Sequence, residues 1–393
     1  MRLTLVQTIT RFAQMLQTEL FPRLEVCGAK LTPEHKRVAA AIAMLPLDRF
    51  VPVSRGWIGR PAKDRLCIAR AYVAKSVMNL GTTRQLLERL TVDSSLRGLC
   101  GWAELEHLPH ESTFSRAFAE FAESELGQFT HEALIRETQQ GRLIGHIARD
   151  STAIQAREKF RQTPKQKQQR EGRCQKRKSR TSHKGQKNRK LSKKAKRKEQ
   201  TAKTVTGQQL GNSAEQILQT IPRECSIGAK SNEHGTKYWR GYKLHLDVAD
   251  GQIPITALLS SANVHDSKLA IAMTQISTGR VTYLYELMDS AYDSMAIREQ
   301  SEKSGHVAII AEKTRTSGKT QLPLYRKRKP GMEPAKADRF RIRTMVERVN
   351  ARLKDEFGAG NIRVRGAKKV MAHLMFGVLA LTADQLLKFA ENG

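Results

Sequence analysis

The sequence of 393 residues is poor in several features that mark particular classes of protein. Its five cysteines are far apart and never form a Cys-x-x-Cys pair, so we expect neither a disulfide framework nor a zinc ribbon. Apolar runs such as residues 38–45 fall well short of a membrane span, and residues 1–21 mix charged side chains with apolar ones, unlike a signal peptide. These absences predict a soluble protein of a reducing compartment, with no membrane partner.

Acidic residues are also scarce relative to basic ones. There are 38 Asp and Glu against 69 Lys and Arg, which gives a formal net charge of +31. Such an excess favours a polyanionic partner, because each basic group that neutralises a phosphate releases a counterion. A ribosome-bound protein, or a basic protein that is merely well solvated, has the same composition.

The excess is concentrated in residues 157–200, which contain 20 Lys and Arg and three acids, a net charge of +17. This segment has too few apolar residues to offset its ordering entropy, so we expect a basic, disordered insertion over residues 157–205. A phosphate-binding arm that orders on nucleic acid is the favoured interpretation. A solubilising linker or a nuclear-targeting patch has a similar composition.

Before this insertion, the chain has the pattern of several short helices. One helix begins at Pro33, and a longer one begins at Pro61 and ends at Gly81. Further on, Thr82 or Thr83 caps one helix, and Ser112 or Thr113 caps another over residues 114–123. We therefore expect an all-helical N-terminal domain over residues 1–140.

Three arginines of this helical region, Arg84, Arg97 and Arg116, are expected to be exposed. A group of short helices with exposed arginines is typical of a helix-turn-helix-like domain, so DNA-end binding is one interpretation of residues 1–140. Generic core packing gives the same apolar pattern. The sequence does not identify a recognition helix.

From Gly141 the apolar period changes to that of strands. A run within residues 141–156 leads into Asp150, and a second run, 281–288, leads into Asp289. Residues 242–248 alternate as a strand does, 253–259 follow as its partner, and Asp250-Gly251 between them favours a hairpin. A strand over 307–311 and helices over 338–356 and 368–390 complete an α/β domain made of residues 141–156 and 206–393.

The helix around Glu347 has two distinct faces. At about 100° per residue, Phe340, Arg343, Glu347 and Lys354 fall within about 60° of one another. The far side carries the apolar residues that face the core, which are Met345, Val346, Val349 and Leu353. The helix thus presents an acid between two cations. Taken alone, Arg343 and Glu347 are equally an ordinary i,i+4 surface pair.

Together these residues resemble a family, the DDE transposases of bacterial insertion sequences. The resemblance rests on Ala-Arg-Asp-Ser-Thr around Asp150, Leu-Met-Asp-Ser-Ala-Tyr-Asp around Asp289, and Arg-x3-Glu-x6-Lys from Arg343 to Lys354. Residues 241–245 and 263–267 also resemble family sequence. The family signature begins with Tyr where this chain has Phe340, so any role of that hydroxyl is absent or supplied elsewhere. The resemblance covers roughly residues 141–389.

The resemblance implies an RNase H-like mixed sheet flanked by helices and interrupted by the basic insertion. It also implies that Asp150, Asp289 and Glu347 hold two Mg²⁺ (or Mn²⁺) ions, with Asp150 bridging both. Two such ions roughly 3.5–4 Å apart activate an oxygen nucleophile and stabilise a leaving oxyanion, and hard carboxylate oxygens suit them. Arg343 and Lys354 would bind DNA phosphates beside the cut.

The activity implied is cleavage of transposon-end DNA and transfer of the freed 3′-OH to target DNA. The implied partners are double-stranded DNA, both the terminal inverted repeats and the target, and a second copy of the chain, since paired ends usually require a homodimer. The implied location is the bacterial cytoplasm, at the nucleoid. An RNase H-like nuclease without strand transfer, and a non-catalytic nucleic-acid-binding protein, are the alternatives.

Other signals carry less weight. Trp239, between cations, is a candidate for stacking on an unpaired base, although such residues more often cover a sheet edge. His245, His265 and Asp266 suggest a second metal cluster, but a structural role for His245 is favoured, and Asp266 is a candidate acid beside the first. Asp293 is expected to support a helix start. Residues 317–320 resemble the end of a phosphate loop, but position 313 is Lys313 and not the glycine that the loop needs.

Overall fold

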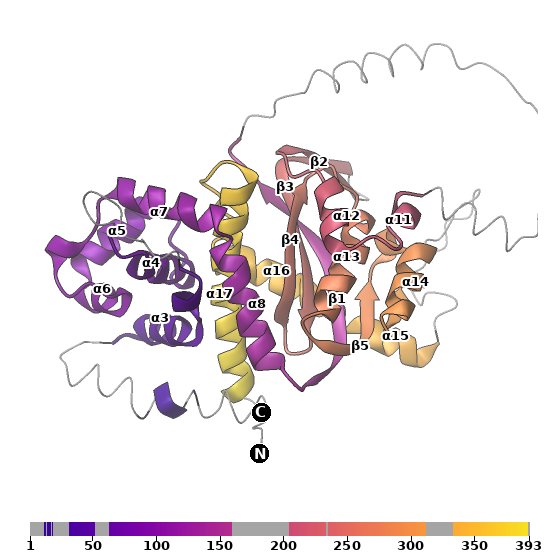
Figure 1. Ribbon diagram of the computed structural model, residues 1–393, viewed down its shortest axis with the longest axis horizontal. Coiled ribbons are helices and arrows are strands. Elements are labelled where there is room, and N and C mark those ends of the chain that lie inside the picture. Colours follow the sequence, from indigo (N-terminus) through magenta and orange to yellow (C-terminus); the bar gives the residue numbers. More distant parts are fainter. Residues whose placement is uncertain are drawn as a thin grey trace, which may run out of the picture.

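The computed structural model describes residues 31–51, 63–158, 204–232, 235–311 and 333–391, and single positions between 12 and 18. The helical region occupies one end of the molecule and a mixed sheet with its covering helices occupies the other (Figure 1). The long helix α17, Ala367–Glu391, stands between them. The basic insertion predicted over residues 157–205 falls almost entirely outside the described residues. The motif at 317–320 lies outside them as well.

The helical region contains six α-helices among its described residues. These are α3 (Pro33–Met44), α4 (Arg65–Val77), α5 (Thr83–Val92), α6 (Ser94–Cys100), α7 (Glu111–Glu123) and α8 (Leu126–Gln139), with single 3-10 turns at Leu47–Arg49 and Leu105–His107. The starts at Pro33 and after Thr82 are confirmed. Thr32 and Thr82 each cap their helix through a capping box. Each threonine hydroxyl accepts from the N–H of the third helical residue, His35 or Gln85, and the side chain of that residue accepts from the threonine N–H.

Two of the predicted helix boundaries are wrong. The helix predicted from Pro61 to Gly81 begins at Arg65, where the Asp64 carboxylate accepts from the N–H of Leu66, and it ends at Val77. The helix expected to follow Ser112 or Thr113 begins at Glu111, capped by the His110 ring, which accepts from the N–H of Ser112. In both cases the helix starts where a side chain, Asp64 or His110, accepts a hydrogen bond from an N–H of the first turn.

The sheet has the order β2-β3-β1-β5-β6, with β4 pairing with β3. Its strands are β1 (Leu143–Gln155), β2 (Ser226–Asn232), β3 (Gly235–Ala249), β4 (Ile253–Ser261), β5 (Thr282–Met288) and β6 (Val307–Ile310). β1 runs antiparallel to β3 and parallel to β5, and β5 runs parallel to β6. This is the mixed sheet expected of an RNase H-like domain.

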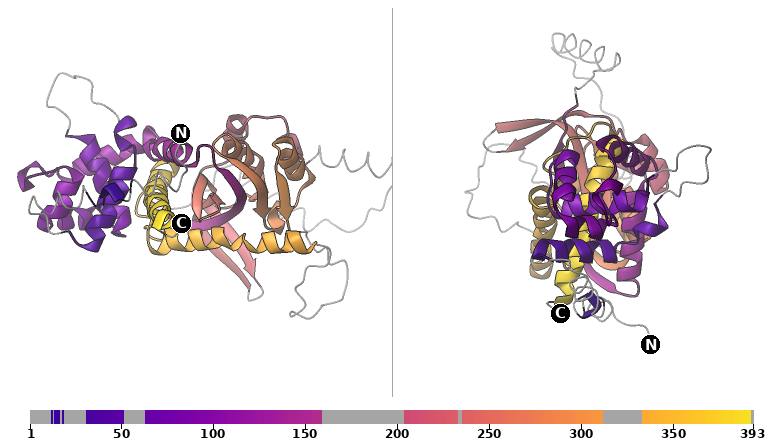
Figure 2. Two further views of the ribbon diagram at one scale, coloured as in Figure 1. Left: turned by 90° about the horizontal axis from the view of Figure 1, so that it is seen from below. Right: turned by 90° about the vertical axis from the view of Figure 1, so that its left-hand side faces the viewer.

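The predicted hairpin joins β3 and β4. Residues 250–252 make the connection, and Gly251 and Gln252 both have positive φ angles, 81° and 61°. β3 is longer than expected, because its first half pairs with β2 and its second half pairs with β1 and β4. The β2–β3 ribbon therefore extends beyond the rest of the sheet (Figure 2).

Helices cover the sheet on its two faces. They include α11 (Val205–Gln208), α12 (Ala214–Thr220), α13 (Ser267–Thr278) and α14 (Met295–Lys303), followed by α15 (Pro334–Arg341) and α16 (Thr344–Asp355). The single helix predicted over 338–356 is interrupted, because at residues 342–343 the backbone tightens into 3-10 hydrogen bonds such as Met345 N–H to the Ile342 carbonyl. The two pieces still run nearly in line (Figure 2).

Helix α17 packs against both halves of the molecule. It contacts α3, α4, α7 and α8 of the helical region, and β4 and α16 of the sheet domain. Its stretch Ala367–Phe389 is long and apolar enough to span a membrane, contrary to the expectation that every apolar run is too short, but 78% of its most apolar window is buried inside the fold. Burial in the core therefore explains the apolar composition of this helix.

Candidate active site

Asp150 and Asp289 occupy adjacent positions at the β1–β5 pairing of the sheet. In the parallel pairing of β1 with β5, the last registered pair is Arg149 with Met288, so the next residue on each strand is one of the two acids. Neighbouring strands lie about 4.8 Å apart, which places the two backbones close together. Asp150 lies within β1, which continues to Gln155, and not at a strand end as its sequence suggests.

The electrostatics of Asp150 reflect this proximity. Burial raises the pKa of its carboxyl to about 6. The N–H of Ser151 and the charge of Arg343 lower this pKa, whereas the charges of Asp289 and Asp266 raise it. A buried carboxyl among other acids lacks sufficient positive charge, so a cation would stabilise its ionised form.

Glu347 is held on the neighbouring helix α16, which packs against β1 and β3. Met345, Val346, Val349 and Leu353 are buried as predicted, each no more than 3% exposed. On the other face, Arg343 donates to the Glu347 carboxylate one turn away, while the Glu347 side chain is 50% exposed. The Arg343 guanidinium also lies 5.7 Å from the centre of the Phe340 ring. Phe340, Arg343 and Glu347 therefore share one face, as predicted.

Lys354 lies on the same face, close enough for its charge to interact with that of Asp150. Burial lowers the pKa of its ammonium group, and the nearby charge of Lys230 on β2 lowers it further. Because successive side chains of a strand point to opposite faces, Asp150 points away from the side of β1 that buries Arg149. It thereby faces α16, the helix that carries Arg343 and Lys354.

The three predicted acids are not gathered into one ligand set. Among the described residues, no three Asp, Glu, His or Cys side chains stand close enough together to hold a metal ion. Asp150 and Asp289 are brought together, whereas Glu347 is engaged by Arg343. Arg343 links the two parts, because it pairs with Glu347 and also lowers the pKa of Asp150.

Sequence reasoning gave too little weight to two residues beside these acids. Asp266 accepts from Lys243 Nζ at 2.9 Å and also bonds the Ser151 side chain. The hydroxyl of Tyr292 is buried and has no hydrogen-bond partner within the described residues, although the charges of Asp266, Asp150 and Asp289 all act on it. The signal was present in the Asp-Ser-Ala-Tyr-Asp sequence, but only the fold shows that the tyrosine turns inward.

The donor chemistry of this group suits a hard divalent cation. Carboxylate oxygens are the ligands that Mg²⁺ and Mn²⁺ prefer, the charges of Asp289 and Asp266 act on the buried Asp150 carboxyl, and the hydroxyl of Tyr292, unpartnered among the described residues, lies in the same group. Glu347 could join only after leaving Arg343. The residues therefore fit such an ion once the exposed glutamate turns inward.

The two histidines near the acids bond to nearby hydroxyls. His245, on β3, is fully buried, shares a hydrogen bond of 2.8 Å with the Ser260 hydroxyl, and has a pKa lowered to about 4 by burial, whereas its buried Nδ1 has no partner among the described residues. His265 bonds the Ser267 hydroxyl at the start of α13. Asp293 accepts from Arg298, and so ties the segment before α14 to that helix.

The other predicted DNA contacts lie on α7 and on the β2–β3 ribbon, where the Trp239 ring centre is 6.0 Å from Nζ of Lys243, the partner of Asp266. The Trp239 ring packs on Gly228 of β2, its paired residue, and its Nε1 donates to the Tyr242 carbonyl at 3.1 Å. Arg116 is exposed on α7. Arg97, expected to be exposed, is half-buried and donates to the carbonyls of Leu90 and Thr91 at the end of α5.

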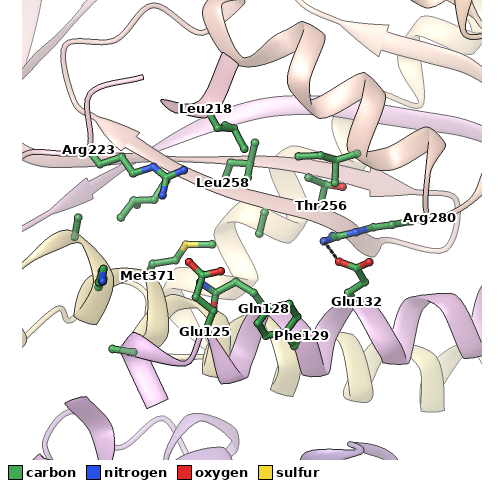
Figure 3. A pocket seen from close by; sticks show the side chains of 16 residues that line it. Glu125, Gln128, Phe129, Glu132, Leu218, Arg223, Thr256, Leu258, Arg280 and Met371 are labelled. Atoms are coloured by element: carbon green, nitrogen blue, oxygen red, sulfur yellow. Dashed lines mark hydrogen bonds and ion pairs between the residues drawn. The ribbon is translucent and has the colours of Figure 1, made fainter. Parts of the chain in front are cut away.

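A cavity of about 230 Å³ lies between α8, β4 and the helices beside them (Figure 3). Glu132 and Arg280 form an ion pair of 2.9 Å along its wall, and Glu125, Gln128 and Arg223 also face it. None of the three predicted acids lines this cavity. It is therefore separate from the candidate active site.

Two family models match parts of the chain. Residues 219–383 match the family model described as "Transposase DDE domain", and residues 27–120 match the one described as "Transposase domain (DUF772)". The first match contains Asp289 and Glu347, whereas Asp150 lies before it. No curated protein and no solved structure gives a significant match.

Proposed function

The chain belongs to the DDE transposases of insertion-sequence type, and from this premise we propose that it cleaves transposon-end DNA and joins the freed 3′-OH to target DNA. The observation that carries the proposal is the adjacent placement of Asp150 on β1 and Asp289 directly after β5, beside Arg343 and the helix α16, which bears Glu347 and Lys354. That arrangement puts acids for metal binding beside cations for phosphate binding.

In this proposal, Asp150, Asp289 and Glu347 hold two Mg²⁺ or Mn²⁺ ions. Such ions, when bound, activate an oxygen nucleophile and stabilise the leaving oxyanion. The protein's own part is to position the DNA. Lys354 supplies a point charge beside Asp150, and Arg343 changes partner, from the Glu347 carboxylate to a phosphate of the DNA.

The exchange at Arg343 gives the site two states. Without DNA, Arg343 holds Glu347 away from the other acids. A phosphate that takes the guanidinium releases Glu347, whose half-exposed side chain is free to turn toward Asp150. The ligand set is therefore completed by the substrate.

The remaining partners follow from the same proposal. The duplex substrates are the terminal inverted repeats and the target DNA, and two ends are paired by a homodimer in the bacterial cytoplasm. Arg116 on α7 and Trp239 on the β2–β3 ribbon are proposed as further DNA contacts. For Trp239 the packing on Gly228 is a sufficient structural role, so its contribution to binding is the weaker of the two.

A cleavage and joining assay tests the function. The purified protein is incubated with DNA that carries the element's two ends and with a target plasmid, in Mg²⁺, in Mn²⁺ and in EDTA. We expect end-specific cuts and joined products with either metal, and no joined product when the transferred end is a 3′-dideoxynucleotide. Cuts without joining would favour the nuclease alternative. Binding without metal-dependent cuts would favour the non-catalytic one.

A further inference from the structure

A second cationic site lies between the helical region and the segment that follows α16. It is a cavity of about 500 Å³, bounded by α4, α5 and α7 on one side and by residues 363–373 on the other. Five basic residues line it, namely Lys75, Arg84, Arg363, Arg365 and Lys369. Glu111 is the only acid among the lining residues, and it faces Arg84 at 3.7 Å. The cavity thus carries an excess of positive charge.

Lys75 is the unusual member of this group. The residue is only 7% exposed, and although its backbone carbonyl accepts from the Leu80 N–H, its ammonium group forms no hydrogen bond or ion pair with the described residues. Burial lowers the pKa of its ammonium group to about 8, so it still carries most of its charge near pH 7. A buried cation without a counter-charge is costly, and an anion in the cavity would offset that cost.

The surrounding groups add to the positive potential. Helix α5 begins at Thr83 and helix α17 at Ala367, and residues of both first turns line the cavity. Helix N-termini carry partial positive charge and unpaired N–H groups. His373, which also lines the cavity, is neutral at pH 7, because burial and the Lys75 charge lower its pKa to about 4.

A neighbouring cavity continues the basic surface toward the acids. It measures about 710 Å³ and is lined by Arg89 and Glu88 of α5 and by Lys354 of α16. Gly81 lines both cavities, so the two meet beside the start of α5. Lys354, whose charge acts on Asp150, thus lies in a cavity that adjoins the one around Lys75. Two adjoining cavities that both contain cations suit an extended polyanion better than a small phosphate.

We propose that the cavity around Lys75 binds a backbone phosphate of the transposon-end duplex, with Lys75 as the buried cation and Arg363, Arg365 and Lys369 at its rim. The inference rests on the proposed function, since it takes the same DNA as partner. It adds that α5 and the segment after α16 grip this DNA together. The helical region and the catalytic domain then form one binding surface.

Binding of an end duplex in EDTA, where no cleavage occurs, tests this site. The variants are Lys75→Met, which keeps the length of the side chain, and the exposed double variant Arg363→Gln/Arg365→Gln. Lys303→Met, on α14 and paired only across its own helix turn with Glu299, is the control. We expect Lys75→Met to weaken binding roughly tenfold, the loss typical of one charged hydrogen bond. We also expect the slope of log K against log salt to fall by about 0.9.

The thermal midpoint of Lys75→Met and the binding of the double variant distinguish lost DNA contacts from lost folding. The thermal midpoint of Lys75→Met should equal or exceed that of the wild type, which separates lost binding from lost folding. If Lys75→Met does not fold, the double variant decides, and unchanged affinity and slope in it overturn the inference. If Lys75→Met folds and binds the end duplex with the affinity and the salt slope of the wild type, the inference is also overturned.

Inorganic phosphate distinguishes a small ligand from DNA. Suppose that phosphate raises the thermal midpoint of the wild type but not that of Lys75→Met, and that the two proteins bind DNA equally well. That result overturns the assignment to DNA. The proposed function fails separately. If the wild type cuts no DNA in Mg²⁺ while Lys75→Met still loses affinity, the catalytic proposal falls and this site remains.

Discussion

Arg149 on β1 donates two hydrogen bonds to Asp247 on β3, Nε to Oδ1 at 2.7 Å and Nη2 to Oδ2 at 2.8 Å. Both residues are essentially inaccessible, at 1% and 0% exposed, and they are registered partners across the sheet. Nη2 also lies 3.3 Å from Glu286 of β5. The residue that follows Arg149 is Asp150, so this buried network fixes the strand that carries the first acid.

Arg149→Met should therefore be severely destabilising. It leaves Asp247 and Glu286 buried without their cation, and breaking such a pair from one side costs about 3–5 kcal/mol of the free energy of unfolding. Urea unfolding followed by circular dichroism measures this. The triple variant Arg149→Met/Asp247→Asn/Glu286→Gln should recover part of the loss. A cost below about 1 kcal/mol for Arg149→Met alone, as expected of an exposed pair, would contradict the role given to the network.

The proposed metal ligands predict a separation of cleavage from binding. Asp150→Asn, Asp289→Asn and Glu347→Gln should each reduce end cleavage to background, because each removes a negative oxygen ligand. Affinity for the end duplex should not fall. Asp293→Asn is the matched control, since Asp293 lies four residues from Asp289 but pairs with Arg298, and it should keep cleavage. If one of the three variants still cuts at the wild-type rate, the residue it replaces is not part of the site.

Lys75 predicts a dependence of stability on pH. Burial lowers the pKa of Lys75 to about 8 in the folded protein, whereas an unfolded chain has a lysine pKa of about 10.4. Between these values the unfolded chain binds more protons than the folded one, so the Lys75 contribution to stability rises with pH. Below pH 8 both states are protonated and the full cost of burial remains.

Lys75→Met should therefore be more stable than the wild type at pH 7, by about 1–3 kcal/mol. The difference should shrink as pH rises from about 8 to about 10. Chemical unfolding of both proteins across this range, in a buffer without phosphate, measures the difference and cancels the titration of other groups. A difference independent of pH would show that the lysine is not titrating in this window.

The pairing of Gly228 with Trp239 predicts a strong coupling between the two positions. A Cβ at residue 228 would lie 2.3 Å from the Trp239 ring, so Gly228→Ala should cost about 1–3 kcal/mol of stability by overpacking. In the Trp239→Ala background the same change should cost little. A double-mutant cycle measures the coupling, and additive effects would show that the ring does not occupy the space above Gly228.

The same variants bear on the proposed DNA role of Trp239. Trp239→Ala should weaken binding to single-stranded or distorted ends by roughly 1–3 kcal/mol if the ring stacks on a base. Affinity equal to that of the wild type would leave the ring with its structural role alone.

The sequence was sufficient for much of the sheet and the closing helix. Alternation located the strands that become β3 and β4, and helical spacing correctly put Arg343 and Glu347 on one face and Val346 on the other. Such features depend on local periods. Spacing did not decide whether Asp150, Asp289 and Glu347 work together, because strand register and the packing of α16 against the sheet are tertiary properties.

Other features could not be found from local patterns. Lys75 sits among the apolar residues of α4 and reads as an ordinary helix lysine, and its significance comes from residues 363–373, far away in the chain. The Tyr292 hydroxyl and the Asp266–Lys243 pair also depend on how separate strands meet. The α4 boundary was misplaced because Asp64 supplied a better cap than Pro61 offered as a start.

The position of α17 has a consequence for synthesis. A ribosome that has made residues 1–366 has produced the helices and strands on both sides of α17, yet the apolar surfaces that receive this helix remain uncovered. In a nascent chain these surfaces are therefore covered only after α17 has emerged. The two halves of the fold are thus joined around their common core helix only after α17 has been translated.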